Sequence, residues 1–186
     1  MPDTTLPYQI VIFTLQHSIT GGVFLHDQRL SDFLNDRRQT SIFLRNASVA
    51  RLEDPAKILE KTVRSVIPKI GIMLVFEPPQ KAAPPPRRFI NYPKERHEVF
   101  LALDGMEVRG FLHVQGPLDL LNIMTNAAVL FLPLTQATVT FDVNPNFVLK
   151  GDAIMVNTQL IRFMGELPTK SPATPPPPAT PVEPLA

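Results

Sequence analysis

Cysteine and tryptophan are absent from this 186-residue sequence, and histidine occurs only four times. The lack of cysteine excludes disulfide bonds, thiol nucleophiles and thiolate metal ligands. The four histidines offer few imidazole ligands for a metal site, which needs three or four converging side chains. We therefore expect no metal and no cofactor. The composition also agrees with a reducing compartment.

Long apolar segments and a strong charge imbalance are also absent. The longest apolar run, A-A-V-L-F-L-P-L at residues 127–134, has the length of a strand and is too short to cross a membrane. The first residues, M-P-D-T-T-L-P-Y, lack the basic and apolar regions of a signal peptide. The net charge of +1 gives no overall attraction to nucleic acid or to an acidic membrane. These features predict a soluble, cytoplasmic protein with no membrane partner.

Sequence signatures of catalysis are missing as well. The chain contains no G-x-S-x-G nucleophile motif. It also lacks the glycine-rich phosphate loops G-x-G-x-x-G and G-x-x-x-x-G-K-[ST]. We therefore predict that the protein is not an enzyme, and we assign no catalytic residue.

Proline, by contrast, is abundant, with 21 residues. Prolines are concentrated in residues 78–88 and 168–186, where they disfavour helices and central strands. We interpret residues 78–88 as an extended linker and residues 168–186 as a disordered tail. The hydrophobic content of 44% is sufficient for a core in the two remaining segments, residues 6–77 and 89–167.

These two segments resemble each other. At a constant spacing of 87 residues, seven positions in a window of twelve are identical. The matching residues are Phe24, Leu25, His26, Gln28, Asp32, Leu34 and Asn35 in the first segment and Phe111, Leu112, His113, Gln115, Asp119, Leu121 and Asn122 in the second. The similarity predicts two tandem copies of one domain.

Each copy has the pattern strand–strand–helix–strand–strand. In the second copy, Asp104-Gly105 between two alternating apolar runs predicts a hairpin with a type I′ turn. The short helices are expected to start at Leu30 and at Pro117, since proline suits the first helical position. The predicted fold class is mainly β (α+β), with two ββαββ repeats that form twisted sheets or partial barrels.

Polar residues recur in both copies and have two interpretations. The recurring residues are His26 and His113, Asp32 and Asp119, and Asn35 and Asn122. A structural interpretation places the aspartates in the first helical turn, where a carboxylate meets free N–H groups, and the asparagines near the helix end. A chemical interpretation takes each His–Asp pair as an acid–base or metal site. We favour the structural interpretation.

The repeated pattern resembles an uncharacterised bacterial family of small β-rich domains of unknown function. The resemblance is carried by the motifs G-x-h-h-H, where h is an apolar residue, R-L-S-D-F-L-N and F-L-x-L-T-x-A-x-V. The resemblance covers residues 22–35 with Phe43-Leu44 in the first copy and residues 110–122 with 131–139 in the second, where G-P-L-D-L-L-N replaces R-L-S-D-F-L-N. The resemblance implies a fold and brings no activity with it.

Two shorter stretches are similar to ligand-binding families. The stretch R-R-F-I-N-Y-P-K-E-R resembles the opening of PilZ cyclic-dinucleotide receptors, which would make Arg87, Arg88 and Arg96 ligand-binding residues. The stretch L-D-G-M-E-V-R-G-F-L at residues 103–112 resembles the first motif of Sm-like RNA-binding barrels. Both resemblances imply binding of a nucleotide or a nucleic acid.

The leading functional hypothesis is a non-enzymatic interaction or regulatory module with an unknown protein partner, which also self-associates through unpaired strand edges. Ile123 and Met124 are the predicted contact surface, because at the spacing of 87 residues they replace Asp36 and Arg37 of the first copy with apolar side chains. The alternative is a nucleotide or nucleic-acid binding module. A second alternative is a hydrolase or metal enzyme that uses the repeated histidines and aspartates.

Overall fold

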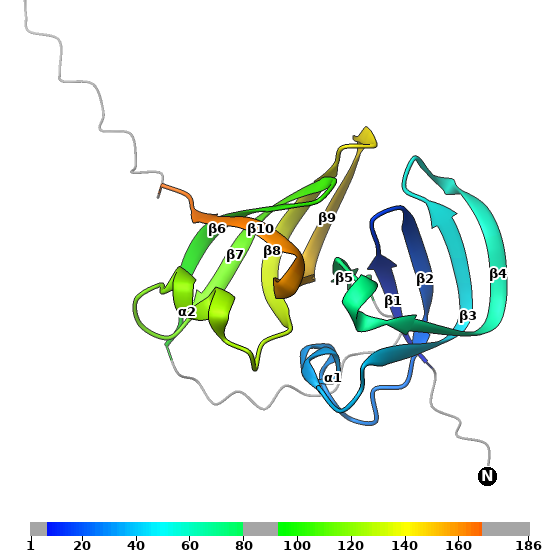
Figure 1. Ribbon diagram of the computed structural model, residues 1–186, viewed down its shortest axis with the longest axis horizontal. Coiled ribbons are helices and arrows are strands. Elements are labelled where there is room, and N and C mark those ends of the chain that lie inside the picture. The colour runs from blue at the N-terminus through cyan, green and yellow to red at the C-terminus, as the bar shows by residue number, and fades with distance from the viewer. Residues whose placement is uncertain (1–6, 80–92, 169–186) are drawn as a thin grey trace, which may run out of the picture.

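The computed structural model describes residues 7–79, here called the N-terminal half, and residues 93–168, the C-terminal half. Ten antiparallel strands form one open sheet in the order β10-β6-β7-β8-β9-β5-β1-β2-β3-β4 (Figure 1). The prediction of a mainly β fold is confirmed. Most of the predicted linker and tail lies outside the described residues.

The N-terminal half contains five strands, one short helix and one 3-10 turn. Its elements are β1 (Tyr8–Phe13), β2 (His17–Val23), α1 (Leu30–Asn35), β3 (Ser41–Arg51), β4 (Asp54–Pro68), η1 (Lys69–Gly71) and β5 (Leu74–Phe76). The C-terminal half has the same order of elements. These are β6 (Glu95–Leu103), β7 (Met106–Val114), α2 (Leu120–Thr125), β8 (Phe131–Phe141), β9 (Asn144–Asn157), η2 (Thr158–Leu160) and β10 (Ile161–Glu166). Each half therefore has a fifth strand that the predicted ββαββ pattern lacks.

Each half curls around a core of its own, and Figure 1 shows the two curved lobes. In β7, Met106, Val108 and Leu112 point inward and alternate with exposed residues, as the period of two in the sequence predicts. We call the cluster around these residues the C-terminal core. The N-terminal core gathers around Ile12 and Leu44. Burial of these apolar side chains is the main force that stabilises both lobes.

The two lobes are joined through β5 and β9, which pair side by side in the middle of the sheet. Leu74 lies opposite Val156, and Val75 lies opposite Met155. Leu74 belongs to the C-terminal core, although it comes from the N-terminal half, and Met155 belongs to the N-terminal core. This junction therefore exchanges apolar side chains between the halves as well as hydrogen bonds.

Two local predictions for the C-terminal half were wrong in detail. The β6–β7 hairpin forms, but only Gly105 has a positive φ (77°), so the turn is not type I′, which needs two such residues. Helix α2 begins at Leu120 and not at Pro117. Its start is set by Asp119, whose side chain accepts a hydrogen bond from the N–H of Asn122 and so caps the helix.

Corresponding positions in the two halves are 89 or 90 residues apart and not 87. The clearest markers are two bulges, at Asn46 and Gln136, each with a φ of 48°. Beside each bulge a glycine lies against an alanine of the next strand, because a Cβ on Gly110 would lie 2.9 Å from the Cβ of Ala137, and Gly21 is similarly close to Ala47. The identities at a spacing of 87 therefore do not mark equivalent positions. The letters F-L-H follow β2 in the first half but lie within β7 in the second.

Within the described residues, both α-helices have only six residues, and neither has the length or the apolar character needed to cross a membrane.

Candidate functional site

The two repeated histidines lie in different environments. His26 has a φ of 44° and lies in the turn after β2, with its ring 6.4 Å from that of Phe24. His113 lies within β7, and its Nε2 is 2.8 Å from the Oγ1 of Thr135. In the part of the chain that the structure describes, no hydrogen bond or ion pair joins either histidine to Asp32 or Asp119. Among residues 7–79 and 93–168, no group of three or more potential metal ligands forms.

The two repeated aspartates also differ. Asp119 is the N-cap of α2, at 2.9 Å from the N–H of Asn122, whereas Asp32 lies inside the first turn of α1. The hydroxyl of Ser31 is 3.5 Å from the Asp32 carboxylate. Both carboxylates lie near the positive end of a helix, but only Asp119 satisfies a free backbone N–H group.

Asn35, at the end of α1, links the two halves. Its Nδ2 donates to the carbonyl oxygen of Phe131 at 3.0 Å and to that of Ser31 at 2.9 Å. Its Oδ1 accepts from the N–H groups of Leu130 at 2.7 Å and Phe131 at 2.8 Å. One side chain therefore holds α1 against the start of β8. Asn122, the residue that matches Asn35 at the spacing of 87, is exposed on α2.

A buried asparagine and a buried lysine complete the junction. Asn157 in β9 donates from Nδ2 to the carbonyl oxygens of Lys69 (3.2 Å) and Ile72 (2.8 Å). Lys69 donates from Nζ to the carbonyl oxygens of Phe33 (3.2 Å) and Asp36 (2.9 Å) at the end of α1. Burial lowers the pKa of Lys69 below 10.5, and the charge of Asp36 opposes that effect. A cation at this place suits the negative end of the helix dipole.

Arg96 is the member of the predicted arginine set that the structure describes, since Arg87 and Arg88 lie outside the described residues. Its guanidinium lies 3.4 Å from the centroid of the Phe111 ring. It also donates a hydrogen bond to Oε1 of Gln136, the bulge residue of β8. The stack fixes a planar cation on the exposed face of the C-terminal half.

A hollow of about 430 Å³ begins at the same bulge and extends to the junction. Lys150 and Thr138 provide donors in its wall, Asp152 and Glu77 provide carboxylates, and the ring of Phe76 provides an apolar surface. The remaining lining residues are Pro79, Gln136, Ala137 and Gly151. The hollow can take a small ligand with polar and apolar parts.

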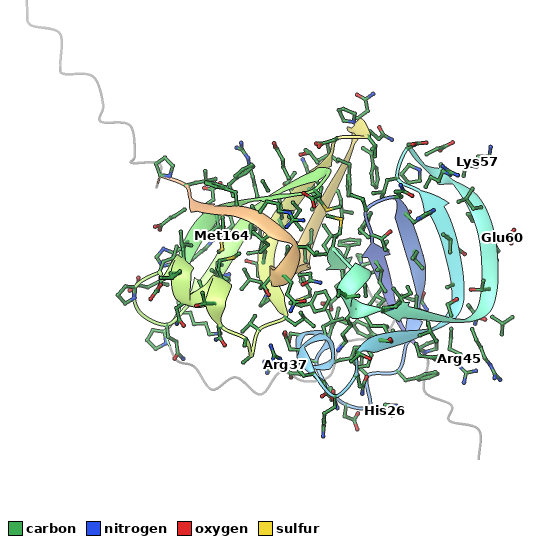
Figure 2. All side chains as sticks on the ribbon, viewed as in Figure 1. His26, Arg37, Arg45, Lys57, Glu60 and Met164 are labelled. Carbon is green, nitrogen blue, oxygen red and sulfur yellow. The ribbon has the colours of Figure 1, made fainter. Side chains whose placement is uncertain are left out.

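Arginines also lie near phenylalanine rings elsewhere on the sheet. The Arg45 guanidinium is 5.9 Å from the ring centroid of Phe24 and 5.7 Å from that of Phe43. Arg109 is 5.5 Å from the ring centroid of Phe100. Figure 2 labels Arg45 at the lower edge of the N-terminal half, on the same side as His26 and Arg37. Both halves thus carry arginine–aromatic contacts.

The predicted contact residues Ile123 and Met124 lie on α2. Both are half-buried and pack against the C-terminal core. Leu121, one of the exposed apolar residues, is 74% exposed on the same helix. Leu121 is therefore the large apolar side chain of α2 that is exposed to solvent.

The two outer edges of the sheet are β4 and β10, and in the described residues each pairs with one neighbour only. Val63 and Val66 on β4 and Phe163 on β10 are exposed apolar side chains. Figure 2 labels Lys57 and Glu60 of β4 at the outer side of the N-terminal half and Met164 of β10 in the C-terminal half. An unpaired edge with apolar side chains is a surface on which a further strand can add.

Sequence reasoning did not find the fifth strands, which supply both the junction and one open edge. The short runs L-V-F at residues 74–76 and I-R-F-M at residues 161–164 were their signal, but each is too short to stand out. It also did not find the role of Asn35 between the halves, because that role depends on residues about 95 positions away.

Comparison with family models, curated proteins and solved structures found no match for this chain. Function therefore has to be inferred from two features of the molecule, the open sheet edges and the face around Arg96.

Proposed function

We propose that the protein is a non-enzymatic interaction module made of two tandem copies of one domain. The shared order of elements and the shared strand order in the two halves support the duplication. The two glycine–alanine contacts at equivalent bulges support it as well, because such a close approach is a specific feature.

The observation that carries the proposal is the pair of open edges at opposite ends of one continuous sheet. Val66 on β4 is 64% exposed and Phe163 on β10 is 58% exposed. Isolated exposed apolar residues are common, but residues on an unpaired strand combine free backbone groups with apolar surface. Strand addition uses both features for binding.

Photo-crosslinking in cells tests this function. A benzophenone amino acid is placed at residue 66, at residue 163 or, as the control, at Glu107, an exposed residue of β7 that pairs with Ala102 of β6 and Thr140 of β8. We expect protein crosslinks from residues 66 and 163 and few from residue 107, with the captured protein identified by mass spectrometry. Equal or absent crosslinks at all three positions would contradict the proposed function.

A second candidate function is binding of a nucleotide or a single-stranded nucleic acid, as the similarity to PilZ and Sm-like domains suggests. The stack of Arg96 on Phe111 beside the hollow with Lys150 favours it. Aromatic rings and arginine planes are the surfaces on which bases stack, and cations bind phosphates.

Fluorescence anisotropy with labelled single-stranded RNA, single-stranded DNA and a cyclic dinucleotide tests this candidate. We expect Arg96→Ala to weaken binding at least tenfold and higher salt to weaken it further. Arg162→Ala is the matched control, because Arg162 pairs with Asp104 at 2.7 Å, away from the hollow. The candidate fails if the unaltered protein binds none of the three probes or if the two variants bind alike.

A further inference from the structure

The two open edges correspond to the two edges that already pair inside the chain. In the strand order, β10 takes the place in its half that β5 takes in the other, and β4 takes the place of β9. Since β5 and β9 pair at the junction, we propose that β10 of one chain pairs with β4 of a second copy in the same antiparallel way. This inference rests on the proposal that the halves are copies, and it names the partner as the chain itself.

The register of the new pairing follows from the internal one. At the junction Leu74, Val75 and Phe76 lie opposite Val156, Met155 and Ile154. The pairing of β5 with β1 and of β10 with β6 places Phe163 at the position of Leu74. The pairing of β3 with β4 and of β8 with β9 likewise places Ile67 at the position of Val156. The predicted pairs between two copies are Phe163 with Ile67, Met164 with Val66, and Gly165 with Ser65.

Side-chain burial at the equivalent positions supports this pairing. Leu74 and Met155 are 0% and 6% exposed at the junction, where each enters the core of the other half. Their counterparts on the open edges, Phe163 and Val66, are also apolar, yet they are 58% and 64% exposed. Pairing with a second copy would place Phe163 over its N-terminal core and Val66 over the C-terminal core of the first chain. The same apolar surface would then be buried at every junction.

The flanking residues of the two edges match as well. The same register sets Glu166 of β10 opposite Arg64 of β4, which is an opposite-charge pair. It also sets Leu167, whose N–H extends the β10 hydrogen bonding to Glu98, opposite the exposed Val63.

The outer junction lacks two contacts of the inner one. Pro68 stands in the place of Asn157 and has no N–H group to donate, and Thr125 stands in the place of Asn35. We therefore expect self-association to be reversible on dilution, whereas the inner junction is held within one chain. A head-to-tail contact of this kind closes into a ring or continues as a filament.

Mass measurement of the purified full chain by light scattering over a dilution series tests the inference. We expect multiples of the 20.8 kDa chain that fall to the monomer on dilution. Val66→Glu and Phe163→Glu should each give a monomer, and Val148→Glu should assemble as the unaltered chain does. A mixture of the first two variants should give a species of two chains, because each variant keeps the edge that the other has lost. A monomer at all concentrations, or no effect of either edge variant, would overturn the inference.

A disulfide test checks the register and does not depend on glutamate substitutions. Because the chain contains no cysteine, the double variant Val66→Cys with Met164→Cys has only the introduced thiols. Directly opposite residues have Cβ atoms about 4.5–5.5 Å apart, within reach of a disulfide after small adjustments. Oxidation should give a ladder of linked chains on a non-reducing gel. The control, Val148→Cys with Met164→Cys, should give little, and an equal ladder from both would overturn the register.

The crosslinking experiment separates this inference from the proposed function. If residues 66 and 163 capture the chain itself, the inference and the function both stand. If they capture a different protein and the purified chain stays monomeric, the function stands and the inference fails.

Discussion

The helices α1 and α2 have the same length and the same place in their halves, yet they are held in different ways. Helix α1 buries Leu30, Phe33 and Leu34, whereas α2 has no buried residue. Helix α1 lies at the inner junction and contacts β8 of the other half, while α2 lies in the half that ends at the open edge β10. Helix α1 is therefore held by its own buried residues in the N-terminal core and by β8 of the neighbouring half.

Truncation of the fifth residue of each helix tests this comparison most strongly. Leu34→Ala should lower the free energy of unfolding by about 3 kcal/mol, because Leu34 is fully buried in the N-terminal core. Met124→Ala should cost only about 1 kcal/mol, because Met124 is half-buried. Urea unfolding of both variants, made in the Phe163→Glu background to keep the chain monomeric, gives the two values. Equal losses would mean that the helices are equally well packed and would break the comparison.

Removal of the asparagine that each helix carries is the next test. Asn35→Ala should cost about 2 kcal/mol, because the N–H groups of Leu130 and Phe131 lose their acceptor. Asn122→Ala should change stability by less than about 0.5 kcal/mol, since this side chain is exposed. The same urea titrations measure both. If Asn122→Ala lowers the free energy of unfolding as much as Asn35→Ala does, the two asparagines have the same structural role.

Those two asparagines also show what the sequence can predict and what it cannot. The mainly β fold, the β6–β7 hairpin and the existence of both helices follow from alternation, from a turn dipeptide and from short apolar periodicity, which are local. The alignment of the two halves cannot be predicted in the same way. Their hairpins and loops differ in length, and this moves the equivalent positions from a spacing of 87 to one of 89 or 90 residues. Identical residues 87 positions apart were therefore predicted to be equivalent. The strand registers show that they occupy different positions in the two halves.

Of the candidate sites, the sequence predicted Arg96 but not the open edges of the sheet. Arg96 was predicted from the resemblance of R-R-F-I-N-Y-P-K-E-R to PilZ receptors, and the structure places its guanidinium on the ring of Phe111. The edges β4 and β10 could not be recognised, because a strand is an edge only when the order of all ten strands is known. Val66 and Phe163 look like ordinary core residues in the sequence. They become candidate contact residues only when their buried counterparts, Met155 and Leu74, are seen at the junction.

The smallest expected difference concerns how each helix starts. Helix α2 has a side-chain cap, since Asp119 accepts from the N–H of Asn122, whereas the residue before α1, Arg29, caps no N–H group with its side chain. Asp119→Ala should therefore lower stability by about 1 kcal/mol. Asp32→Ala removes only a favourable charge near the start of α1 and should cost less than about 0.5 kcal/mol.

Thermal unfolding of the two variants in parallel measures this difference, and Asp119→Asn is the matched control because asparagine also caps helices. Asp119→Asn should retain most of the stability that Asp119→Ala loses. A helix without buried residues depends on its cap, while a helix held by Asn35 and Lys69 does not. A larger loss of stability for Asp32→Ala than for Asp119→Ala would contradict this prediction. It would mean that α1 depends on the charge in its first turn at least as much as on its contacts at the junction.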